Sequence, residues 1–565
     1  MMEHSLNTVI CVLNSRYIHS SLAPWCLLAG IDTFCENAIN ATVIEGTINE
    51  RLEDIAQRIL AQNPQIVGFC CYIWNITATK QLIKLVKNKL PHTTIVLGGP
   101  EVSYNTESIL HAEPLVEYII SGEGEKPFAL LLNAIFHSTG VQNIPGVCYR
   151  NGNHLVVAAP NIHEEDLPNP YTKQYLDALK GRIAYLETSR GCPYACAFCL
   201  SARCGSVRYF NLAESKNKLL LLANSGTQII KLVDRTFNAN RKRAAELFSF
   251  IIQNYGIAIP KNLRFHFEIA GDLLDEEIID LLATAPVGSI QFEIGLQSFN
   301  TQTLIAINRK TDVKRLKNNI QLLVSNANIH VHLDLIAGLP YEDFNTFKES
   351  FNTAYSLQPN VLQLGFLKIL FGTPMSDNPQ KFPYLYAQQP PYEVKETPWI
   401  SSKELILLHH VEDALQSLFN SGRFLRTLEY LLKQTGDTPF ALLSRFGEFA
   451  ANVGTRKISL DDYTALVFAY FRKQRGIDRT VLRDVMVCDR LATNSSGNLP
   501  TILRIDDPAI KAAIKKLAAV APPHHGVKRS YALLYSEHCL VYVDYHHKNP
   551  ISGEYPLCKY NLHSG

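Results

Sequence analysis

The stretch that decides the fold is Glu187-Thr-Ser-Arg-Gly-Cys192-Pro-Tyr-Ala-Cys196-Ala-Phe-Cys199, in which three cysteines follow the spacing C-x3-C-x2-C. It lies directly after a predicted strand over residues 183–187, so the cysteines fall in a loop. Three thiolates suit a [4Fe–4S] cube that keeps one iron open for a chelating small molecule. The alternatives are a closed zinc or cluster site, with Cys204 as fourth ligand, and three cysteines without a metal. A closed site would leave no position for chemistry.

Outward from this loop, strand and helix patterns alternate six times. The predicted strands cover residues 183–187, 228–233, 264–269, 289–294, 330–336 and 361–370, with amphipathic helical patterns between them. Six βα units are fewer than the eight of a closed barrel. The sequence therefore predicts a six-unit partial βα barrel.

An earlier alternating series precedes the barrel. Its predicted strands cover residues 8–13, 42–45, 66–70, 94–97 and 117–120, with helical patterns that include 50–62 and 77–90. This spacing predicts a doubly wound α/β domain, a parallel sheet covered on both faces with ligands at the carboxyl ends of its strands. The loops at those ends are 14–17, 98–101 and 122–125.

Two further regions differ in character. Residues 138–180 are rich in Asn, Pro and Gly, which indicates a hairpin and a linker. Beyond residue 390 we expect an α+β module with helices over 402–434, 450–475 and 508–518 and a β-hairpin over 531–545. The expected domains are 1–137, the hairpin and linker 138–180, the barrel 181–380 and the C-terminal module 390–565.

Composition narrows the class of protein. The chain has 565 residues, of which 47 % are apolar and 19 % are charged, so it is neither disordered nor collagen-like. Its formal net charge of +2 does not indicate nucleic-acid binding, although a local patch is not excluded. No apolar run approaches the roughly 20 residues of a membrane span. Thirteen cysteines without a secretion signal favour a reducing compartment, which we expect to be the cytoplasm.

The cysteine segment resembles the radical S-adenosylmethionine (SAM) superfamily, whose hallmark is C-x3-C-x-aromatic-C. Phe198 supplies the aromatic residue and is counted among the expected SAM-binding residues. The resemblance implies that Cys192, Cys196 and Cys199 hold a [4Fe–4S] cluster whose open iron chelates SAM. It also implies reductive cleavage of SAM to a 5′-deoxyadenosyl radical and an electron donor of the flavodoxin or ferredoxin type.

Polar residues at later strand ends extend this resemblance to the branch with oxygen-independent coproporphyrinogen oxidase and the tRNA methylthiotransferases. The resemblance implies that SAM is held by Glu268, Gln297, Arg309 and Asp334. A guanidinium can pair with the SAM carboxylate, while acids and amides bond its hydroxyl and ammonium groups. Gly338 would let the backbone approach SAM closely. Asp234, at the end of the second barrel strand, is either a SAM or substrate contact or an ordinary polar residue.

The N-terminal domain resembles the cobalamin-binding domain of the B12-dependent radical SAM class. The residues that carry this resemblance, and the cobalamin contacts that it implies, are Asn14, Tyr17, Gly98, Gly99, Pro100, Gly122 and Glu123. Glycines would allow a flat corrin to approach the backbone. The alternative is a Rossmann-like module without this cofactor.

One loop departs from the cobalamin pattern. Proteins that replace the lower cobalt ligand have Asp-x-His-x-x-Gly, whereas this chain has Tyr17-Ile-His19-Ser-Ser-Leu22. The Asp that would orient the imidazole and the Gly are missing. We therefore expect His19 to be an ordinary loop histidine, with the cobalt-ligand role as the alternative.

The family implies methylation of an unactivated carbon: the adenosyl radical removes a hydrogen atom and methylcobalamin delivers the methyl group. Cobalamin-assisted rearrangement, cyclisation or oxidative decarboxylation is the second enzymatic hypothesis. A non-catalytic Fe–S or cobalamin sensor or carrier is the third. The sequence identifies neither the substrate nor individual catalytic residues.

Overall fold

The computed structural model describes residues 5–36, 38–163, 167–454, 458–522 and 525–561. The chain forms two compact units, which are described separately. The first unit contains Met1–Thr284, Leu304–Thr311 and Phe366–Pro398, and the second contains Ala285–Thr303, Asp312–Gly365 and Trp399–Gly565. The division falls within the segment in which the sequence predicts one barrel.

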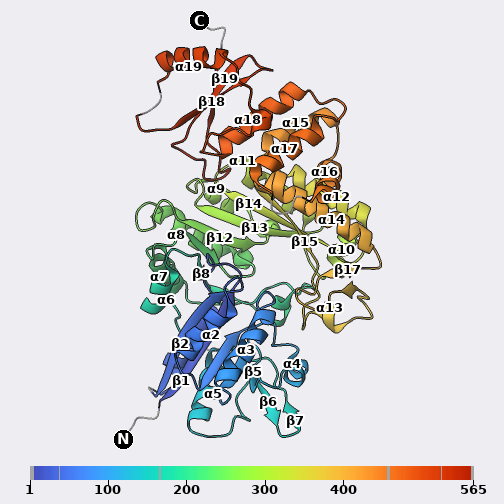
Figure 1. The fold of residues 1–565 in the computed structure, drawn as a ribbon. Helices are drawn as coiled ribbons and strands as arrows, with labels where there is room; N and C mark the ends of the chain where they lie inside the picture. The colour runs from blue at the N-terminus through green and yellow to red at the C-terminus, as the bar shows by residue number, and fades with distance from the viewer. Residues whose placement is uncertain (1–4, 37, 164–166, 455–457, 523–524, 562–565) are drawn as a thin grey trace. The chain divides into compact units, whose positions relative to one another are not determined.

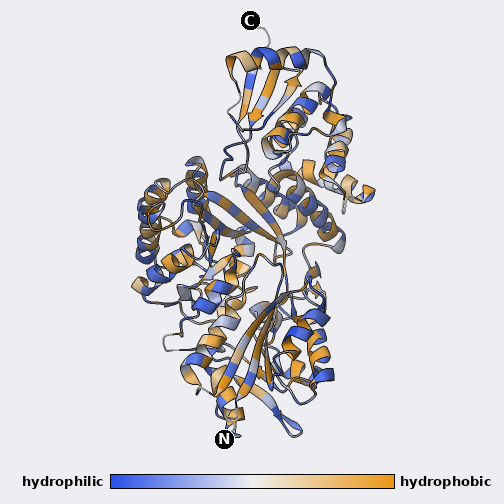
Figure 2. Ribbon diagram, turned by 60° about the vertical axis from the view of Figure 1, so that its left-hand side comes forward, coloured by the Kyte–Doolittle hydropathy of each residue, from blue (hydrophilic) through white to orange (hydrophobic). Residues whose placement is uncertain are grey.

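The first unit begins with a seven-stranded sheet of order β2-β1-β3-β4-β5-β6-β7 (Figure 1). Strands β1 to β5 are parallel, and this order is that of a doubly wound sheet whose topological switch lies between β1 and β3. Figure 2 shows strongly hydrophobic strands in this sheet, with hydrophilic residues on the helices beside it. Helix α1 packs against α5, and α2 packs against α3. The bounds are β1 Leu6–Asn14, α1 Ala23–Phe34, β2 Ile39–Thr47, α2 Leu52–Leu60, β3 Ile66–Cys70, α3 Ile76–Lys89, β4 Thr94–Gly98, α4 Thr106–Ala112, β5 Tyr118–Ile120, α5 Glu125–Phe136, β6 Val147–Asn151 and β7 His154–Val156.

The expected hairpin over 138–180 is confirmed in part. Strands β6 and β7 form it, and β6 pairs antiparallel with β5, so the hairpin extends the sheet of the preceding domain. The expected linker also contains the helix α6, Lys173–Leu179, whose first turn is capped by the side chain of Thr172. A segment rich in Asn, Pro and Gly indicates where turns lie, but it does not indicate that β6 pairs with β5.

The first unit continues with three parallel strands of order β8-β11-β12. Helices follow these strands, and a long connection after β8 contains the three cysteines. The bounds are β8 Ala184–Leu186, β9 Ser189–Arg190, the 3-10 turn η1 Leu200–Arg203, β10 Arg208–Tyr209, α7 Leu212–Ala223, β11 Ile229–Leu232, η2 Phe237–Ala239, α8 Arg241–Asn254, β12 Arg264–Ile269, η3 Gly271–Leu273, α9 Glu276–Ala283, α13 Pro374–Asp377, β16 Leu385–Tyr386 and β17 Val394–Glu396.

The second unit contains the next three strands of the series. Strands β13 and β14 are parallel and alternate between fully and half-buried residues, as expected for strands with one face in a packed layer. The bounds are β13 Ile290–Gln297, α10 Thr301–Ala306, α11 Val313–Ser325, β14 His330–Ala337, α12 Phe344–Ser356 and β15 Val361–Phe366, where α10 crosses the boundary between the units. All six strands that the sequence predicts are therefore present.

The C-terminal part of the second unit is an α+β module, as expected. Its bounds are α14 Ser402–Leu415, the π-helical turn η4 Gln416–Asn420, α15 Leu425–Thr435, α16 Pro439–Val453, α17 Leu460–Phe471, α18 Arg479–Thr493, η5 Thr501–Leu503, α19 Ala509–Val520, β18 Arg529–Leu534, β19 Cys539–Asp544 and β20 Leu557–Asn561. The strands are antiparallel in the order β18-β19-β20, so the hairpin expected over 531–545 is confirmed and gains a third strand.

Two helix predictions in this module are wrong. The helix expected over 402–434 is interrupted by η4 and by Gly422, which has φ +69°. The prediction missed this break because the apolar pattern continues through it and the break needs only one left-handed residue. The helix begins after Ser401, whose side chain forms a capping box with Glu404. The helix expected over 450–475 corresponds to the end of α16 and to α17, and residues 455–457 between them lie outside the described residues. Among the described helices, none combines the length and apolarity that crossing a membrane requires.

Candidate active site

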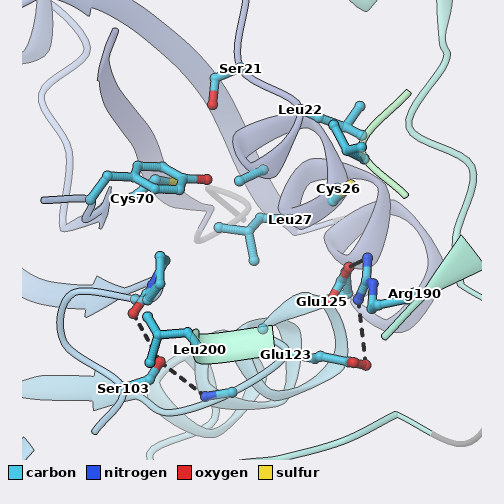
Figure 3. A pocket seen from close by; sticks show the side chains of 18 of the residues that line it. Ser21, Leu22, Cys26, Leu27, Cys70, Ser103, Glu123, Glu125, Arg190 and Leu200 are labelled. Carbon is cyan, nitrogen blue, oxygen red and sulfur yellow. Dashed lines mark hydrogen bonds and ion pairs between the residues drawn. The ribbon is translucent and has the colours of Figure 1, made fainter. Parts of the chain in front are cut away.

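The carboxyl ends of β1, β3, β4 and β5 open onto a cavity of about 760 Å³ within the first unit (Figure 3). The opposite wall comes from the first barrel strands and from the loop that carries the cysteines. Residues of this second wall are Tyr185, Ser189, Arg190, Cys204, Lys231 and Glu268. Cavities of roughly 300–1,000 Å³ accommodate sizeable ligands, and doubly wound sheets bind theirs at this edge.

Six of the seven predicted cobalamin contacts line this cavity: Asn14, Gly98, Gly99, Pro100, Gly122 and Glu123. Tyr17 is not brought into this set. Its side chain is 66 % exposed, and its ring lies 5.8 Å from the guanidinium carbon of Arg182.

The glycines of the cavity have different structural causes. Gly99 has φ +108°, and a Cβ there would lie 2.5 Å from the Cys71 carbonyl oxygen. Gly122 has φ +86°, and its Cβ would lie 2.2 Å from the Asn161 carbonyl oxygen. Backbone packing therefore requires both. A Cβ at Gly98 would have no neighbour closer than 3.8 Å, so this residue offers bare backbone beside the cavity, as a flat cofactor requires.

His19 also lines the cavity, and its ring already has a partner. Its Nδ1 lies 2.8 Å from the Tyr185 hydroxyl of β8. Burial, together with the charges of Lys231 and Arg16, lowers the pKa of His19, which favours the neutral imidazole. A tyrosine on another element therefore orients this ring, in place of the aspartate that its own loop lacks.

Trp74 is a cavity residue that the sequence did not indicate. Its indole stacks on Tyr72 with ring centroids 4.4 Å apart, and its Nε1 donates a hydrogen bond of 3.2 Å to the Leu13 carbonyl. The indole is 47 % exposed. A fixed flat ring of this kind suits the wall of a site for a planar cofactor.

The three predicted cluster ligands lie between β8 and η1, in residues 187–199, which we call the cluster loop. Cys196 is buried, while Cys192 and Cys199 are half-buried. Backbone hydrogen bonds hold the middle of the loop: the Ala197 amide donates to Ile307 at 2.9 Å, and the Met375 amide donates to Ala197 at 3.0 Å. The middle of this loop is thus fixed to two other segments of the first unit.

The donor chemistry of this loop fits a cubane cluster. Within the described part of the chain, no three His, Cys, Asp or Glu side chains converge on a single metal position. Three thiolates of a cubane need not converge, because each binds a different iron. Burial raises the pKa of the Cys196 thiol, whereas Arg309 opposes this increase, with its Nη1 3.8 Å from Cys196 Sγ. A guanidinium here favours the thiolate that binds iron.

The predicted SAM residues are divided between the two units. In the first unit, Glu268 lines the cavity with its carboxylate 3.9 Å from Lys231 Nζ and 3.9 Å from Arg235 Nη1. Arg309 lies against the cluster loop and over the Tyr194 ring, with 5.2 Å between guanidinium carbon and centroid. Phe198 is half-buried in that loop.

In the second unit, Gln297 and Asp334 lie on neighbouring parallel strands, with Gly295 paired opposite Asp334. Asp334 Oδ1 is 3.0 Å from His332 Nε2. Gly338 has φ +91°, a conformation that favours glycine. Contact of these residues with SAM remains a prediction.

Asp234 has a structural role. It is 2 % exposed and accepts hydrogen bonds from the Thr188 amide at 3.0 Å, the Thr188 hydroxyl at 2.7 Å and the Ser189 hydroxyl at 2.5 Å. Burial raises its pKa to about 6. It therefore holds the start of the cluster loop and does not belong to the cavity lining.

Family models match three segments of the chain. The radical SAM superfamily matches residues 186–354, the B12 binding domain matches residues 24–132, and the family described as protein of unknown function (DUF4080) matches residues 380–527. These assignments agree with the cysteine loop and with the glycine-lined cavity.

Relatives of known name share parts of the chain. The cobalamin-dependent radical SAM methyltransferase TokK of Streptomyces tokunonensis is 27 % identical over 305 residues, which are 51 % of this chain and 44 % of TokK. The anaerobic magnesium-protoporphyrin IX monomethyl ester cyclase of Cereibacter sphaeroides is 25 % identical over 327 residues, 55 % of this chain and 52 % of the cyclase. The chain thus spans about half the length of these relatives.

Two solved structures share the fold. The cobalamin-dependent SAM radical enzyme OxsB, with aqua-cobalamin and SAM bound, has a TM-score of 0.61 at 14 % identity and covers 92 % of this chain and 81 % of its own. The radical SAM methyltransferase TsrM of Kitasatospora setae has a TM-score of 0.55 at 18 % identity, with 66 % and 75 % covered. The radical SAM domain is the site of a [4Fe–4S] cluster and SAM, and the B12 binding domain is the site of cobalamin. The chain is a radical SAM protein with an N-terminal B12 binding domain and a C-terminal DUF4080 domain.

Proposed function

We propose that this chain is a cobalamin-dependent radical SAM methyltransferase that acts on an unactivated carbon. The observation that carries the proposal is the cavity of the first unit, which the strand ends of the B12 binding domain share with residues flanking the cysteine loop. One cavity would therefore adjoin both cofactor sites. The name of TokK supports methyl transfer.

When bound, the cluster with SAM supplies a radical that removes a hydrogen atom, and cobalamin supplies the methyl group. The chain holds and orients these groups. Cys192, Cys196 and Cys199 would bind the irons, and Arg309, whose Nη1 lies 3.8 Å from Cys196 Sγ, would pair with the carboxylate of SAM. Lys231 and Arg235 fix the carboxylate of Glu268 at the cavity wall. Gln297 and Asp334, which lie in the second unit, are the other predicted SAM contacts.

The apolar part of the lining protects the reaction. Leu22, Leu27, Ile120 and Phe128 give the cavity apolar walls, which would limit water beside the bound cofactors. Exclusion of other hydrogen donors allows a carbon-centred radical to persist until it receives the methyl group.

Among the alternatives of cobalamin-assisted rearrangement, cyclisation and oxidative decarboxylation, cyclisation is the second candidate. The match to the anaerobic magnesium-protoporphyrin cyclase favours it, since that protein shares a similar extent of this chain. A non-catalytic sensor or carrier is the third hypothesis, and turnover of SAM excludes it.

We place the protein in a reducing cytoplasm with a flavodoxin-type or ferredoxin-type electron donor. All thirteen cysteines lie among the described residues and are unpaired. An open cluster also needs a compartment poor in oxidants and a one-electron reductant.

The first experiment tests the cluster. Anaerobically reconstituted protein should bind about four irons per chain and convert SAM to 5′-deoxyadenosine under reduction. Cys192→Ala, Cys196→Ala and Cys199→Ala should each lose both properties. Cys204→Ala is the matched control and should keep them, because its thiol lines the cavity but is not needed as a ligand. A complete cluster in any of the three variants would refute the ligand assignment.

The second experiment separates methyl transfer from ring formation without the substrate. Protein loaded with hydroxocobalamin and then reduced is incubated with methyl-labelled SAM. Methyl transfer requires S-adenosylhomocysteine and label on the corrinoid in equal amounts. Cobalamin retained without either product would contradict the methyltransferase and favour the cyclase type of reaction.

A further inference from the structure

Arg190 connects the cluster loop to the B12 binding domain. It lies in β9, two residues before Cys192, and its guanidinium forms a fork with the carboxylate of Glu187 at 2.8 Å and 2.8 Å. Its Nη2 also donates to Glu125 Oε1 at 2.9 Å, and Nη1 is 3.4 Å from Glu123 Oε2 (Figure 3). One cation on the cluster loop thus holds two acids of the other domain.

The partner acids belong to the turn that enters α5. Glu125 is the first residue of that helix and is 5 % exposed, and Glu123 lines the cofactor cavity. Glu123 is also paired with Arg208 of β10, the strand that pairs with β9. Arg190 of β9 and Arg208 of β10 therefore form ion pairs with the same turn of the B12 binding domain from two adjacent strands.

The charges of this network are matched and largely buried. The side chain of Arg190 is 17 % exposed, and those of its partners Glu125 and Glu187 are 7 % and 15 % exposed. Burial raises the pKa of Glu125, yet Arg190 holds it below its usual range. A planar guanidinium that serves three carboxylates at once fixes direction as well as distance.

We infer that Arg190 is a positioning residue that fixes the cluster loop against the Gly122–Glu125 turn and so sets the separation between cobalt and cluster. The inference rests on the proposed function, because that separation matters only if both cofactors act in one cavity. Methyl transfer requires that the substrate carbon, SAM and cobalamin are held at fixed positions relative to one another. The ion network supplies this fixed distance, and the backbone beside it is closely packed, because a Cβ at Gly191 would lie 2.8 Å from the Ser206 carbonyl oxygen.

The chain offers a matched control. Arg182 forms a buried bidentate pair with Glu45, at 2.8 Å and 3.2 Å, and also links the B12 binding domain to the segment before β8. It has the same chemistry and similar burial but lies ten residues before the first cluster cysteine. Loss of this pair weakens domain docking without releasing the cluster loop.

The experiment measures geometry. Protein with cluster and cobalamin is reduced to the paramagnetic states, and pulsed EPR gives the distance distribution between cob(II)alamin and the cluster. Wild type and Arg182→Gln should give one narrow distribution. Arg190→Gln should give a broadened or shifted distribution and bind hydroxocobalamin roughly tenfold more weakly, because buried acids lose their partner. Arg190→Lys should restore affinity in part but not the narrow distance, since lysine lacks the fork.

An Arg190→Gln protein with the wild-type distance distribution would overturn the inference, and so would equal broadening in Arg182→Gln. If Arg190→Gln does not fold, Glu123→Gln replaces it, with broadening expected and an unchanged distance overturning the inference. Wild-type protein that binds no cobalamin would instead refute the proposed function, so the two failures are distinguishable.

Discussion

Two buried aspartates, one in each unit, have almost the same surroundings and different consequences. Asp234 in the first unit accepts hydrogen bonds from the amide and hydroxyl of Thr188. Asp489 on α18 in the second unit accepts the same pair from Thr427, at 2.9 Å and 2.7 Å. Burial raises the pKa of both carboxyls to about 6.

The two sites differ in what the bonded segment carries. Thr427 is in the first turn of α15, and Asp489 is also 3.3 Å from the guanidinium of Arg426, which is paired with Glu554. That network joins helices and a loop of the C-terminal module. Thr188 stands four residues before Cys192, at the start of the cluster loop. A perturbed pKa and complete hydrogen bonding therefore do not by themselves identify a functional site; the attached segment does.

The largest expected effect is on stability, in the second unit. Asp489→Ala should lower the free energy of unfolding by about 3–5 kcal/mol, because the Arg426 guanidinium and three other donors lose a buried acceptor. Denaturant unfolding followed by circular dichroism measures it, and iron content should be unchanged. Glu537→Ala is the control, since both partners of its pair with Lys559 are about half exposed, at 47 % and 50 %, and such a pair is worth at most about 1 kcal/mol. Loss of iron from Asp489→Ala would contradict the comparison, because Asp489 would then affect the cluster as well as stability.

The next largest expected effect is on SAM binding beside the cluster loop. Arg309→Ala should weaken SAM binding by about 1.5–3 kcal/mol, because the SAM carboxylate loses a charge-assisted partner, while the cluster remains. Equilibrium dialysis with SAM and iron analysis measure the two quantities. Arg309→Lys should recover part of the affinity. Unchanged SAM affinity in Arg309→Ala would remove this residue from the site.

Asp234→Ala tests the other half of the comparison. Removal of the carboxylate leaves the amide of Thr188 and two hydroxyls without an acceptor, which should cost about 1–3 kcal/mol of stability. The more specific result is a lower iron content after reconstitution, because the start of the cluster loop loses its anchor. Asp234→Asn keeps one acceptor oxygen and should retain more iron. Full iron content in Asp234→Ala would place Asp234 with Asp489 as a purely structural residue.

Local patterns predicted the parts that local physics decides. The cysteine spacing, the six strands and the glycine loops at strand ends were all readable, because periodicity and φ requirements act over a few residues. The helix break near Gly422 was missed because the apolar pattern continues through it.

Long-range partners left no such signal. Arg190 lies inside the stretch that decides the fold, yet its partner Glu125 is 65 positions away. Trp74 is held at the cavity by a hydrogen bond to the carbonyl of Leu13, 61 positions away. Tyr17, which the loop pattern predicted as a cobalamin contact, is exposed. Only folding brings such residues together, so the sequence predicted the location of the site better than its polar network.

The smallest effect is a pH dependence that both aspartates share. A carboxyl whose folded pKa is about 6 and whose ordinary value is 3.8 binds more protons in the folded state than in the unfolded state between these values. Its contribution to stability is therefore complete below about pH 4 and is lost as the pH rises to about 6, with a slope of at most about 1.4 kcal/mol per pH unit. Asp489→Asn, measured by denaturant unfolding from pH 4 to pH 7, should show a flatter profile than wild type over this window. Asp234→Asn should flatten the profile of the first unit in the same direction. The comparison would fail if only one of the two variants changed the slope, because burial, the shared cause of both pKa shifts, would then not govern both sites.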